Sequence, residues 1–321
     1  MLINLSGNII IKDSIDIIII NYNNFELTRS CINSIKDSYK NIINIYVIDN
    51  NSTDGSVEKL KASFPEIIII SNTENFGYAY AVNRGFQASK SEIVIISNND
   101  VVYPPDSISN LIEPFYTLEN IGVIGPQQMY PDGKWQYSYG TYPGIKTALM
   151  DLLLINYISH LIKKIQWKLK ISSKEIKPVE YVDGAIMAIK RTAFQDVNGF
   201  DEDYFFYTEE ADFCYRLKKK GWKILFNPLS EVIHQRGGST SKMGLNPKNN
   251  EMFISSKIKF CNKHLNSIET KSFVLLEKFH HFLLANFFKF LDLVFNGKIK
   301  TINQKKLIFC NLYQGWSNVR Q

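Results

Sequence analysis

The chain runs IDIIIINYN from Ile15 to Asn23, and this stretch decides its fold class. A β-branched run broken only by Asp16 is expected for a strand buried on both faces, as strands of parallel sheets are. Similar runs predict strands at 42–48, 67–70 and 93–96, and helical spacing predicts helices at 25–36, 56–63 and 78–89. Strands that alternate with helices form right-handed βαβ units. We therefore predict an α/β fold with a mainly parallel central sheet flanked by helices.

The second half of the chain continues this pattern and then becomes helical. We predict a helix from Pro104-Pro105 to about Tyr116, a strand at 122–125, a helix at 149–169, a strand at 179–191, a helix at 209–220 and a strand at 223–226. The predicted domains are a sheet domain over residues 1–245 and a C-terminal helical extension over 246–321. Within the extension, 273–295 is apolar over most of the helix circumference. That pattern suits either a membrane surface or packing on the first domain.

Composition and charge limit the classes of partner. The 321 residues carry a net charge of +6, which suits an acidic partner such as a nucleoside diphosphate or an anionic membrane, although a mildly basic soluble protein would carry the same charge. The sequence contains no helix-turn-helix, zinc-finger or RNA-binding pattern, so we expect no nucleic acid partner. Four widely spaced cysteines form no CxxC pair, which favours reduced thiols in a cytoplasmic protein. We find no signal peptide and no run of ~18 uncharged apolar residues.

Polar residues follow the predicted strands, where ligands of open α/β sheets bind. Asp49 ends the second strand and is followed by Asn50-Asn51-Ser52-Thr53-Asp54. A carboxylate at this point can accept a hydrogen bond from a pyrimidine imide or from a ribose hydroxyl. The same residue types are also common turn formers, so a purely structural turn is the alternative. Asn75-Phe76-Gly77 runs into a helix start, where Gly77 permits close approach of a phosphate, and Asn75 could equally be a simple cap.

Several segments, taken in order, resemble the family 2 glycosyltransferases of the GT-A fold, and most closely their rhamnosyltransferase-like members. The segments are IIIINYN (17–23), VIDNNSTDGS (47–56) and NFGYA (75–79) with Asn83 and Gly85, then Asp100, Gly184-Ala185, Glu209-Glu210-Ala211-Asp212 and His234. The resemblance covers roughly residues 14–240. Each motif is weak alone, whereas the ordered combination is specific. It implies a nucleotide-sugar-binding, GT-A-like fold.

The resemblance implies roles for the residues at the strand ends. It assigns donor binding to Tyr22, Asn23, Asp49, Asn75, Gly77 and Asn99. It assigns a divalent metal, Mg²⁺ or Mn²⁺, to Asp100, with His234 completing the site. Oxygen ligands suit both ions, and a cation would neutralise charge on a diphosphate leaving group. The sequence departs from the family's DxD-like motif because Asn98 stands in place of the first aspartate. Without the resemblance, a lone histidine is more often structural.

The acidic helix start is the predicted catalytic centre. Transfer to a sugar hydroxyl requires proton removal, which a positioned carboxylate supplies. By resemblance the second acid of the pair is the base, so Glu210 is chosen over Glu209, with Glu standing where Asp is commoner. The structural alternative is that these acids simply stabilise a helix N-terminus. Asp183, Gly184 and Asp212 are predicted to contact the acceptor, with close packing in a strand and helix capping as alternatives. Arg236 and the glycine-rich 237–238 are predicted to close over the diphosphate.

The resemblance therefore implies an inverting hexosyltransferase of cell-surface polysaccharide synthesis. The expected donor is dTDP-rhamnose or a UDP-hexose. The expected acceptor is a glycan or a polyprenyl-linked oligosaccharide. We expect a cytoplasmic protein, with peripheral contact at the inner face of the plasma membrane left open. Two other classes are considered: a nucleotidyltransferase on a related sheet, which would release pyrophosphate, and a non-catalytic sugar-binding or assembly subunit, which would tolerate Glu210→Gln.

Overall fold

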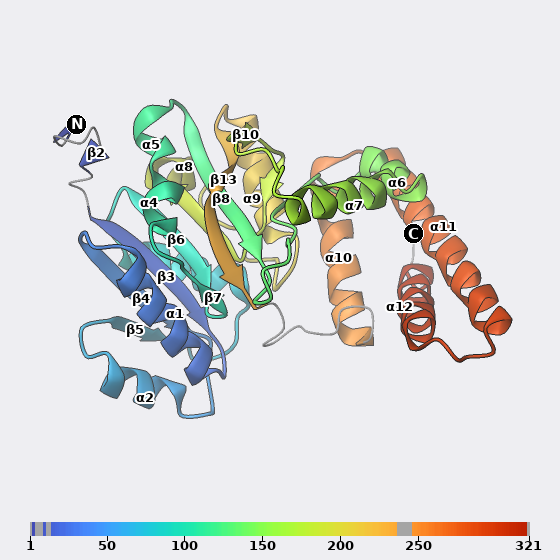
Figure 1. The fold of residues 1–321 in the computed structure, drawn as a ribbon, viewed down its shortest axis with the longest axis horizontal. Helices are drawn as coiled ribbons and strands as arrows, with labels where there is room; N and C mark the ends of the chain where they lie inside the picture. The colour runs from blue at the N-terminus through green and yellow to red at the C-terminus, as the bar shows by residue number, and fades with distance from the viewer. Residues whose placement is uncertain (1, 4–8, 11–13, 236–245, 320–321) are drawn as a thin grey trace. The chain divides into compact units, whose positions relative to one another are not determined.

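The computed structural model describes residues 2–3, 9–10, 14–235 and 246–319 (Figure 1). The chain forms two compact units. The first, here called the sheet unit, comprises Met1–Thr141, Lys164–Phe205 and Glu209–Arg236. The second, here called the helical unit, comprises Tyr142–Lys163, Phe206–Thr208 and Gly237–Gln321.

The centre of the sheet unit is a nine-stranded sheet with the order β10-β13-β8-β12-β6-β3-β4-β5, and β7 pairs with β13. The strands are β3 (Ile15–Asn21), β4 (Ile43–Asp49), β5 (Ile68–Ser71), β6 (Ile93–Asn98), β7 (Val101–Val102), β8 (Ile121–Met129), β10 (Lys177–Pro178), β12 (Ile186–Lys190) and β13 (Lys223–His234). The strands β3 to β6 are mutually parallel, and β8 is parallel to β13. Because β12 is antiparallel to both β6 and β8, six strands share one direction. Their carboxyl ends therefore lie at one edge, and the predicted fold class is confirmed.

Helices cover both faces of this sheet (Figure 1). They are α1 (Phe25–Ser38), α2 (Ser56–Ser63), α3 (Tyr78–Ala88), α4 (Ser107–Ile112), α5 (Pro114–Thr117), α8 (Arg191–Asp196) and α9 (Glu209–Lys219). On one face, Ile17 and Ile19 share a core with Ile32 of α1 and other buried residues of α2 and α4. On the other face, α3 lies so close that a Cβ at Gly85 would be 2.5 Å from the Ile18 side chain. The unbroken isoleucine run thus follows from burial on both faces.

Two small sheets accompany the central one. The strands β1 (Leu2–Ile3) and β2 (Ile9–Ile10) pair with each other, and β9 (Tyr139–Gly140) pairs with β11 (Tyr181–Val182). The single strand predicted over 179–191 is therefore wrong, because β11 and β12 belong to different sheets. The chain turns between them at Asp183, whose Oδ1 accepts a hydrogen bond from the Ala185 amide at 3.0 Å. An aspartate that bonds the backbone two residues ahead is a common turn former.

Two other predicted elements differ in length or continuity. The helix predicted over 149–169 is two helices, α6 (Ile145–Leu152) and α7 (Ile155–Lys168), bent by 71°. Leu154 between them adopts a left-handed conformation with φ +58°. The last strand, predicted to end at Phe226, continues to His234 through an irregular register between Asn227 and Glu231. Such an irregularity accommodates Pro228, which cannot donate to the sheet.

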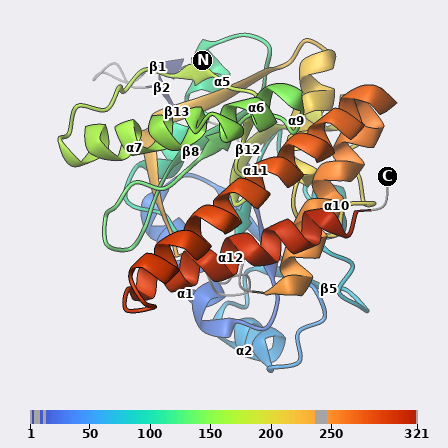
Figure 2. The same cartoon turned by 90° about the vertical axis from the view of Figure 1, so that its right-hand side faces the viewer.

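The helical unit is built from α6, α10 (Pro247–His264), α11 (Ser267–Val294) and α12 (Lys300–Ser317). The helix α11 packs against α6, α10 and α12, and α12 runs beside it in Figure 2. Asn266 and Glu269 form a capping box that starts α11, which satisfies two orphan backbone donors. Phe273 and Trp316 are buried and meet edge to face, with ring centroids 5.8 Å apart. This aromatic pair forms part of the unit's core.

Candidate active site

The carboxyl edge of the sheet gathers most of the residues singled out in the sequence. Asn21 is in register with Asp49, and Ile20 is in register with both Ile48 and Asn98. His234 ends β13, which points the same way as these strands. The 183–185 turn precedes β12, whose antiparallel direction brings it to the same edge. Residues far apart in sequence therefore meet here.

Asp49 is held in a closed hydrogen-bond network and is only 1% exposed. Its Oδ1 accepts from Asn21 Nδ2 at 2.6 Å and from Ser52 Oγ at 2.5 Å, and its Oδ2 accepts from the Ser52 amide at 2.9 Å. Asn21 in turn accepts from Thr28 Oγ1 at 2.6 Å and from Asn99 Nδ2 at 3.2 Å. The sheet edge is thus braced by charge-assisted bonds to a buried carboxylate.

The loops after β3 and β4 are joined by Asn23. Its amide donates to Ser52 Oγ at 2.8 Å, and its Oδ1 accepts from the Thr53 amide at 2.7 Å. Asn23 has φ +51°, a left-handed conformation that asparagine tolerates better than most residues. The neighbouring Tyr22 is 42% exposed. This pair of loops offers an aromatic ring beside a fixed backbone.

The backbone conformation at position 77 requires a glycine. It has φ +90°, and a Cβ there would lie 2.3 Å from the Phe205 carbonyl oxygen. The same oxygen accepts from the Tyr78 amide at 2.8 Å. Asn75 Oδ1 accepts from the Gly77 amide at 3.1 Å, and Asn50 Nδ2 donates to the Gly77 carbonyl at 3.1 Å. The close approach at Gly77 is therefore that of the Phe205 carbonyl.

Asp100 and His234 form a buried pair, with His234 Nε2 3.3 Å from Asp100 Oδ1. The other ring nitrogen, Nδ1, lies 2.8 Å from Oε1 of both Gln128 and Gln136. Gln136 Nε2 donates to the His234 carbonyl at 3.0 Å, so its oxygen faces the ring. Nδ1 therefore carries the proton. The other ring nitrogen, Nε2, is directed toward the Asp100 carboxylate.

A lone pair that faces a carboxylate is favourable only when a proton or a cation lies between them. The Asp100–His234 pair therefore fits either a second proton on His234 or a divalent cation held between the two groups. Among the described residues, no group of three or more histidine, cysteine, aspartate and glutamate side chains converges on one point. Two protein ligands are nevertheless typical of Mg²⁺ sites, in which substrate phosphates and waters supply the rest.

A second acidic cluster lies where α9 begins. Glu209 is buried, and its pKa is raised well above the usual value, first by burial and then by the charges of Glu210 and Asp183. Within the described parts of the chain, Glu209 Oε2 has no hydrogen-bond partner. A Cβ at Gly184 would lie 3.3 Å from Glu210 Cβ. The structure thus brings Glu209, Glu210, Asp183 and Gly184 together.

Tyr78 links this cluster to α3. Its hydroxyl donates to the Gly184 carbonyl at 2.5 Å. Burial raises the pKa of Tyr78 well above the usual value, and the nearby carboxylates of Glu209, Glu210 and Asp183 raise it further. The phenol therefore stays protonated as a donor and holds the 183–185 turn against the start of α3.

Asp212 is placed differently from the other acidic residues of α9. It is fully buried, and its Oδ2 accepts from Arg216 Nε at 2.6 Å. Arg216 also donates to the carbonyls of Val197 and Gly199 at 2.6 and 2.8 Å. Asp212 thus braces the loop before α9 through Arg216. The predicted lid, Arg236 with residues 237–238, lies outside the described residues.

The sequence analysis did not single out Gln128, Gln136 or Tyr78 as site residues. One signal was available for Gln128, because the pair Gln127-Gln128 interrupts an otherwise apolar strand, and both side chains are buried. A polar residue in a strand buried on both faces needs a partner. Gln136 and Tyr78 had no such signal, since their partners lie 98 and 106 residues away along the chain.

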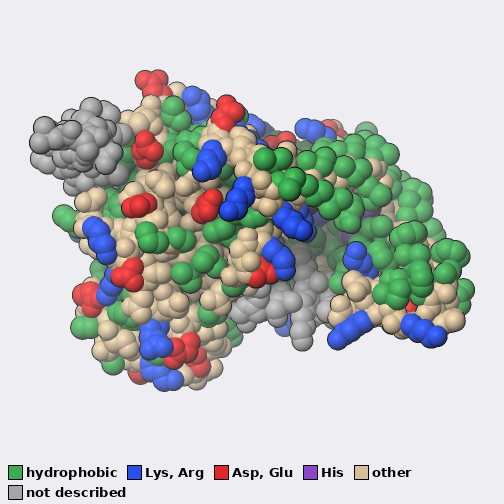
Figure 3. All heavy atoms as spheres, viewed as in Figure 1, with side chains coloured by type: hydrophobic (Ala, Val, Ile, Leu, Met, Phe, Trp, Pro, Cys, Tyr) green, Lys and Arg blue, Asp and Glu red, His purple; other side chains and the backbone are tan. Residues whose placement is uncertain are grey.

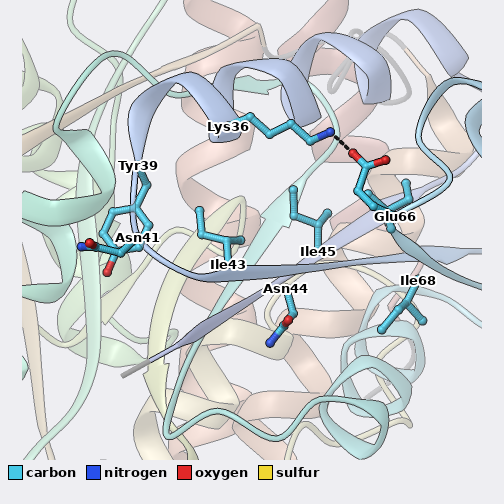
Figure 4. A pocket seen from close by; sticks show the side chains of 9 residues that line it. Lys36, Tyr39, Asn41, Ile43, Asn44, Ile45, Glu66 and Ile68 are labelled. Carbon is cyan, nitrogen blue, oxygen red and sulfur yellow. Dashed lines mark hydrogen bonds and ion pairs between the residues drawn. The ribbon is translucent and has the colours of Figure 1, made fainter. Parts of the chain in front are cut away.

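A separate cavity of about 250 Å³ lies near the amino ends of β4 and β5 (Figure 4). Ile43 and Ile45 line it, and Lys36 pairs with Glu66 across it. Ligands of parallel sheets bind at the carboxyl ends of strands. This cavity is therefore at the opposite end of the strands from the candidate site.

The sheet order and the polar carboxyl edge define a GT-A-type nucleotide-sugar fold. Two solved structures share it. The mannosyltransferase PcManGT from Pyrobaculum calidifontis, in complex with GDP-Man and Mn²⁺, has a TM-score of 0.62 at 14% identity, over 96% of this chain and 86% of that one. GalNAc-T7 with UDP, GalNAc and Mn²⁺ has a TM-score of 0.56 at 16% identity, over 78% of this chain. The match spans about half, 48%, of GalNAc-T7.

The family described as glycosyl transferase family 2 matches residues 16–197, which is more than half of the chain. The protein therefore belongs to glycosyl transferase family 2, and the predicted family is confirmed. A second family, described as the N-terminal domain of galactosyltransferase, matches residues 167–235. That range includes the 183–185 turn, the start of α9 and His234.

Curated relatives are similar over about half to two thirds of the chain. The N-acetylglucosaminyl-diphospho-decaprenol L-rhamnosyltransferase of Mycobacterium tuberculosis is 29% identical over 211 residues, covering 62% of this chain and 69% of that protein. The low-salt glycan biosynthesis hexosyltransferase Agl10 of Haloferax volcanii is 25% identical, covering 70% and 68%. The rhamnosyltransferase WbbL of Escherichia coli is 25% identical, covering 51% and 59%.

Proposed function

We propose that this chain is an inverting hexosyltransferase of cell-surface glycan synthesis. It would move rhamnose or another hexose from a nucleoside diphosphate donor, dTDP- or UDP-linked, to a glycan or polyprenyl-linked acceptor. The names of the relatives support the sugar and the lipid-linked acceptor. The nucleotide sugar and Mn²⁺ of PcManGT, and the UDP and Mn²⁺ of GalNAc-T7, support the donor class and a divalent metal.

One observation carries the proposal: two adjacent acidic residues, the buried Glu209 and Glu210, lie against the 183–185 turn at the sheet edge that also holds Asp49 and Asp100. A binding protein gains nothing from a buried carboxyl whose Oε2 lacks a described partner. Such a group costs stability. Strongly raised carboxyl pKa values at a cleft edge are typical of acid–base sites.

The donor would be held by the loops that follow β3 and β4. The fixed Asn23–Ser52 contact positions Tyr22 beside the nucleoside, and Asp49 keeps both loops in place. Asn75 and Gly77 shape the start of α3, and Asn99 ties the end of β6 to Asn21. A divalent cation held by Asp100 and His234 would offset the charge that develops on the leaving nucleoside diphosphate.

The acceptor would lie over the 183–185 turn, where Gly184 packs close to Glu210. Glu210 takes the proton of the acceptor hydroxyl as the acceptor oxygen bonds to the anomeric carbon. The bond between that carbon and the diphosphate oxygen breaks on the opposite side, which inverts the configuration. Glu209, whose pKa is raised, stays protonated and leaves Glu210 as the carboxylate of the pair.

A cytoplasmic location is part of the same proposal. The four cysteines are free thiols, and three of them are buried. Free thiols are usual in the reducing cytoplasm.

The test is a panel of nucleotide sugars, offered to the full chain with Mn²⁺, with Mg²⁺ or with a chelator. We expect one donor to bind and slowly release its nucleoside diphosphate only when metal is present. Asp100→Ala should abolish this release, and Asp37→Ala on the exposed surface of α1 should not. Release of pyrophosphate from a nucleoside triphosphate would instead identify a nucleotidyltransferase. Failure of every nucleotide sugar to bind would identify a non-catalytic subunit.

A further inference from the structure

The helical unit exposes many large apolar side chains, although one of its ionisable residues, Glu277, is buried. On α11 the exposed residues recur at helical spacing along one side: Leu275, Phe279, Phe282, Phe287, Phe290 and Leu293. Phe290 is 61% exposed and Leu293 is 74% exposed. A helix of a water-soluble unit normally shows the reverse arrangement, with its apolar stripe turned toward the core.

Three ionisable residues of α11 lie on its inner side, whereas others, such as Lys271 and Lys289, are exposed. Glu277 is 1% exposed and lies 3.5 Å from Lys257 of α10. His281 donates to the Glu277 carbonyl at 2.8 Å, and burial lowers the pKa of His281 to about 4. Asp292 pairs with Lys306 of α12 at 2.6 Å. The exposed side of α11 is therefore mainly apolar and also carries Lys271 and Lys289.

The segment formed by α6 and α7 also exposes apolar side chains. No residue of α7 is buried, and the exposed set includes Leu154, Tyr157, Ile158 and Leu161. Within the described ranges, no single helix is long and apolar enough to cross a membrane, although the bent α6–α7 pair passes that test of length and composition. Figure 3 shows hydrophobic side chains gathered over α6, α7 and α11.

The positive charge of this part of the chain indicates which kind of partner covers these apolar faces. Residues 246–319 contain eleven lysines against four acidic residues, a net charge of +7, whereas the whole chain carries +6. Four further lysines, at 163, 164, 168 and 170, lie in or just after α7. Two copies that met through this surface would bring like charges together. Anionic lipid headgroups would instead be attracted to the lysines, and the apolar side chains would enter the acyl boundary.

We infer that the exposed faces of α6–α7 and α11 are a membrane-docking surface that lies in the interface of an anionic lipid bilayer. Contiguous exposed apolar patches on a protein surface mark interaction sites. Docking through such faces combines apolar burial with electrostatic attraction. The inference builds on the proposed function, because a lipid-linked acceptor would lie in the same membrane. The docking surface itself can be tested without the transfer reaction.

The experiment is flotation of the full chain with vesicles of phosphatidylcholine alone or mixed with phosphatidylglycerol. We expect binding only to the mixed vesicles, with loss of binding at high salt. Phe287→Ser with Phe290→Ser should weaken partitioning about a hundredfold, because two exposed rings lose their burial in lipid. Lys289→Gln, Lys298→Gln and Lys300→Gln together should weaken it at least about tenfold.

The matched control is Ile42→Ser with Leu118→Ser, which removes two equally exposed apolar side chains from the sheet unit. This variant should bind vesicles like the wild type. Unchanged flotation of the phenylalanine variant would overturn the inference, as would a wild-type chain that floats with neither vesicle. A dimer that only the phenylalanine variant dissociates would also overturn it and would identify a second copy as the occupant. Donor binding in solution should be the same in all variants, so failure here is separable from failure of the proposed reaction.

Discussion

Two acidic sites at the same sheet edge treat their carboxylates in opposite ways. Asp49 receives three hydrogen bonds from Asn21 and Ser52, so its charge is fully compensated. Glu209 is equally buried, but its Oε2 has no partner within the described ranges, and its pKa is raised. A compensated carboxyl stabilises the loops around it, whereas an uncompensated one costs stability and is typical of acid–base sites. The comparison therefore predicts which residues shape the site and which take part in the reaction.

The largest effect should come from Glu210→Gln. If the acidic cluster supplies the base, this variant should lose about 10²–10⁴-fold in transfer rate, the usual contribution of general base catalysis. Donor binding should be unchanged, because the donor loops lie around Asp49. The measurement is the rate of sugar transfer at saturating donor, together with the donor dissociation constant. Glu58→Gln, an exposed change on α2, is the control and should leave both unchanged.

A Glu210→Gln variant that keeps its transfer rate would contradict the assignment of the base. If Glu209→Gln lost the rate instead, the two residues would exchange roles. If neither variant lost rate, the acidic cluster would be structural, as the helix N-terminus alternative holds.

Asp49→Asn should give the next largest effect, of a different kind. The new amide group would place a donor against Asn21 Nδ2 or the Ser52 amide, so buried donors lose their acceptor. We expect a loss of about 1–3 kcal/mol in the free energy of unfolding, and weaker donor binding as the loops loosen. The measurement is urea unfolding alongside donor titration. The turnover of bound donor should change much less than in Glu210→Gln.

Asp37→Asn removes an exposed carboxyl from α1 and should leave the unfolding free energy within about 0.5 kcal/mol of wild type. If Asp49→Asn were equally neutral, the network around Asp49 would not be what holds the two loops. The hydrogen bonds to Asp49 would then not distinguish its site from that of Glu209 in stability.

The sequence predicted the surroundings of Asp49 better than those of Glu209. The apolar runs located β3, β4 and β6, and parallel pairing then brings their carboxyl ends together whatever the side chains are. The register of Asn21 with Asp49 follows from that geometry.

The bend at Leu154, between α6 and α7, had no comparable signal in the sequence, because neither glycine nor proline marks it. Local pattern reveals which strands are buried, but not where a leucine pair interrupts a helix.

The properties of the Glu209 site depend on contacts between residues far apart in the sequence, which no local pattern predicts. Glu209 has a raised pKa because the fold buries it near Glu210 and Asp183, a residue 26 positions earlier in the chain. The tautomer of His234 likewise depends on Gln136, which is 98 residues away. The resemblance supplied the residues of the site, but their charge states required the tertiary structure.

The smallest effect tests the raised pKa of Glu209 directly. A carboxyl whose folded pKa exceeds its unfolded value of about 4.3 contributes most to stability below that value. The contribution falls as pH rises toward the folded pKa, because the unfolded state ionises first. Glu209→Gln cannot ionise, so its unfolding free energy relative to wild type should rise as the pH increases from about 5 to about 8. Urea unfolding at the two pH values measures this, with Glu58→Gln expected to show no such change. A pH-independent difference for Glu209→Gln would mean that the carboxyl is compensated after all, and the two acidic sites would then be alike.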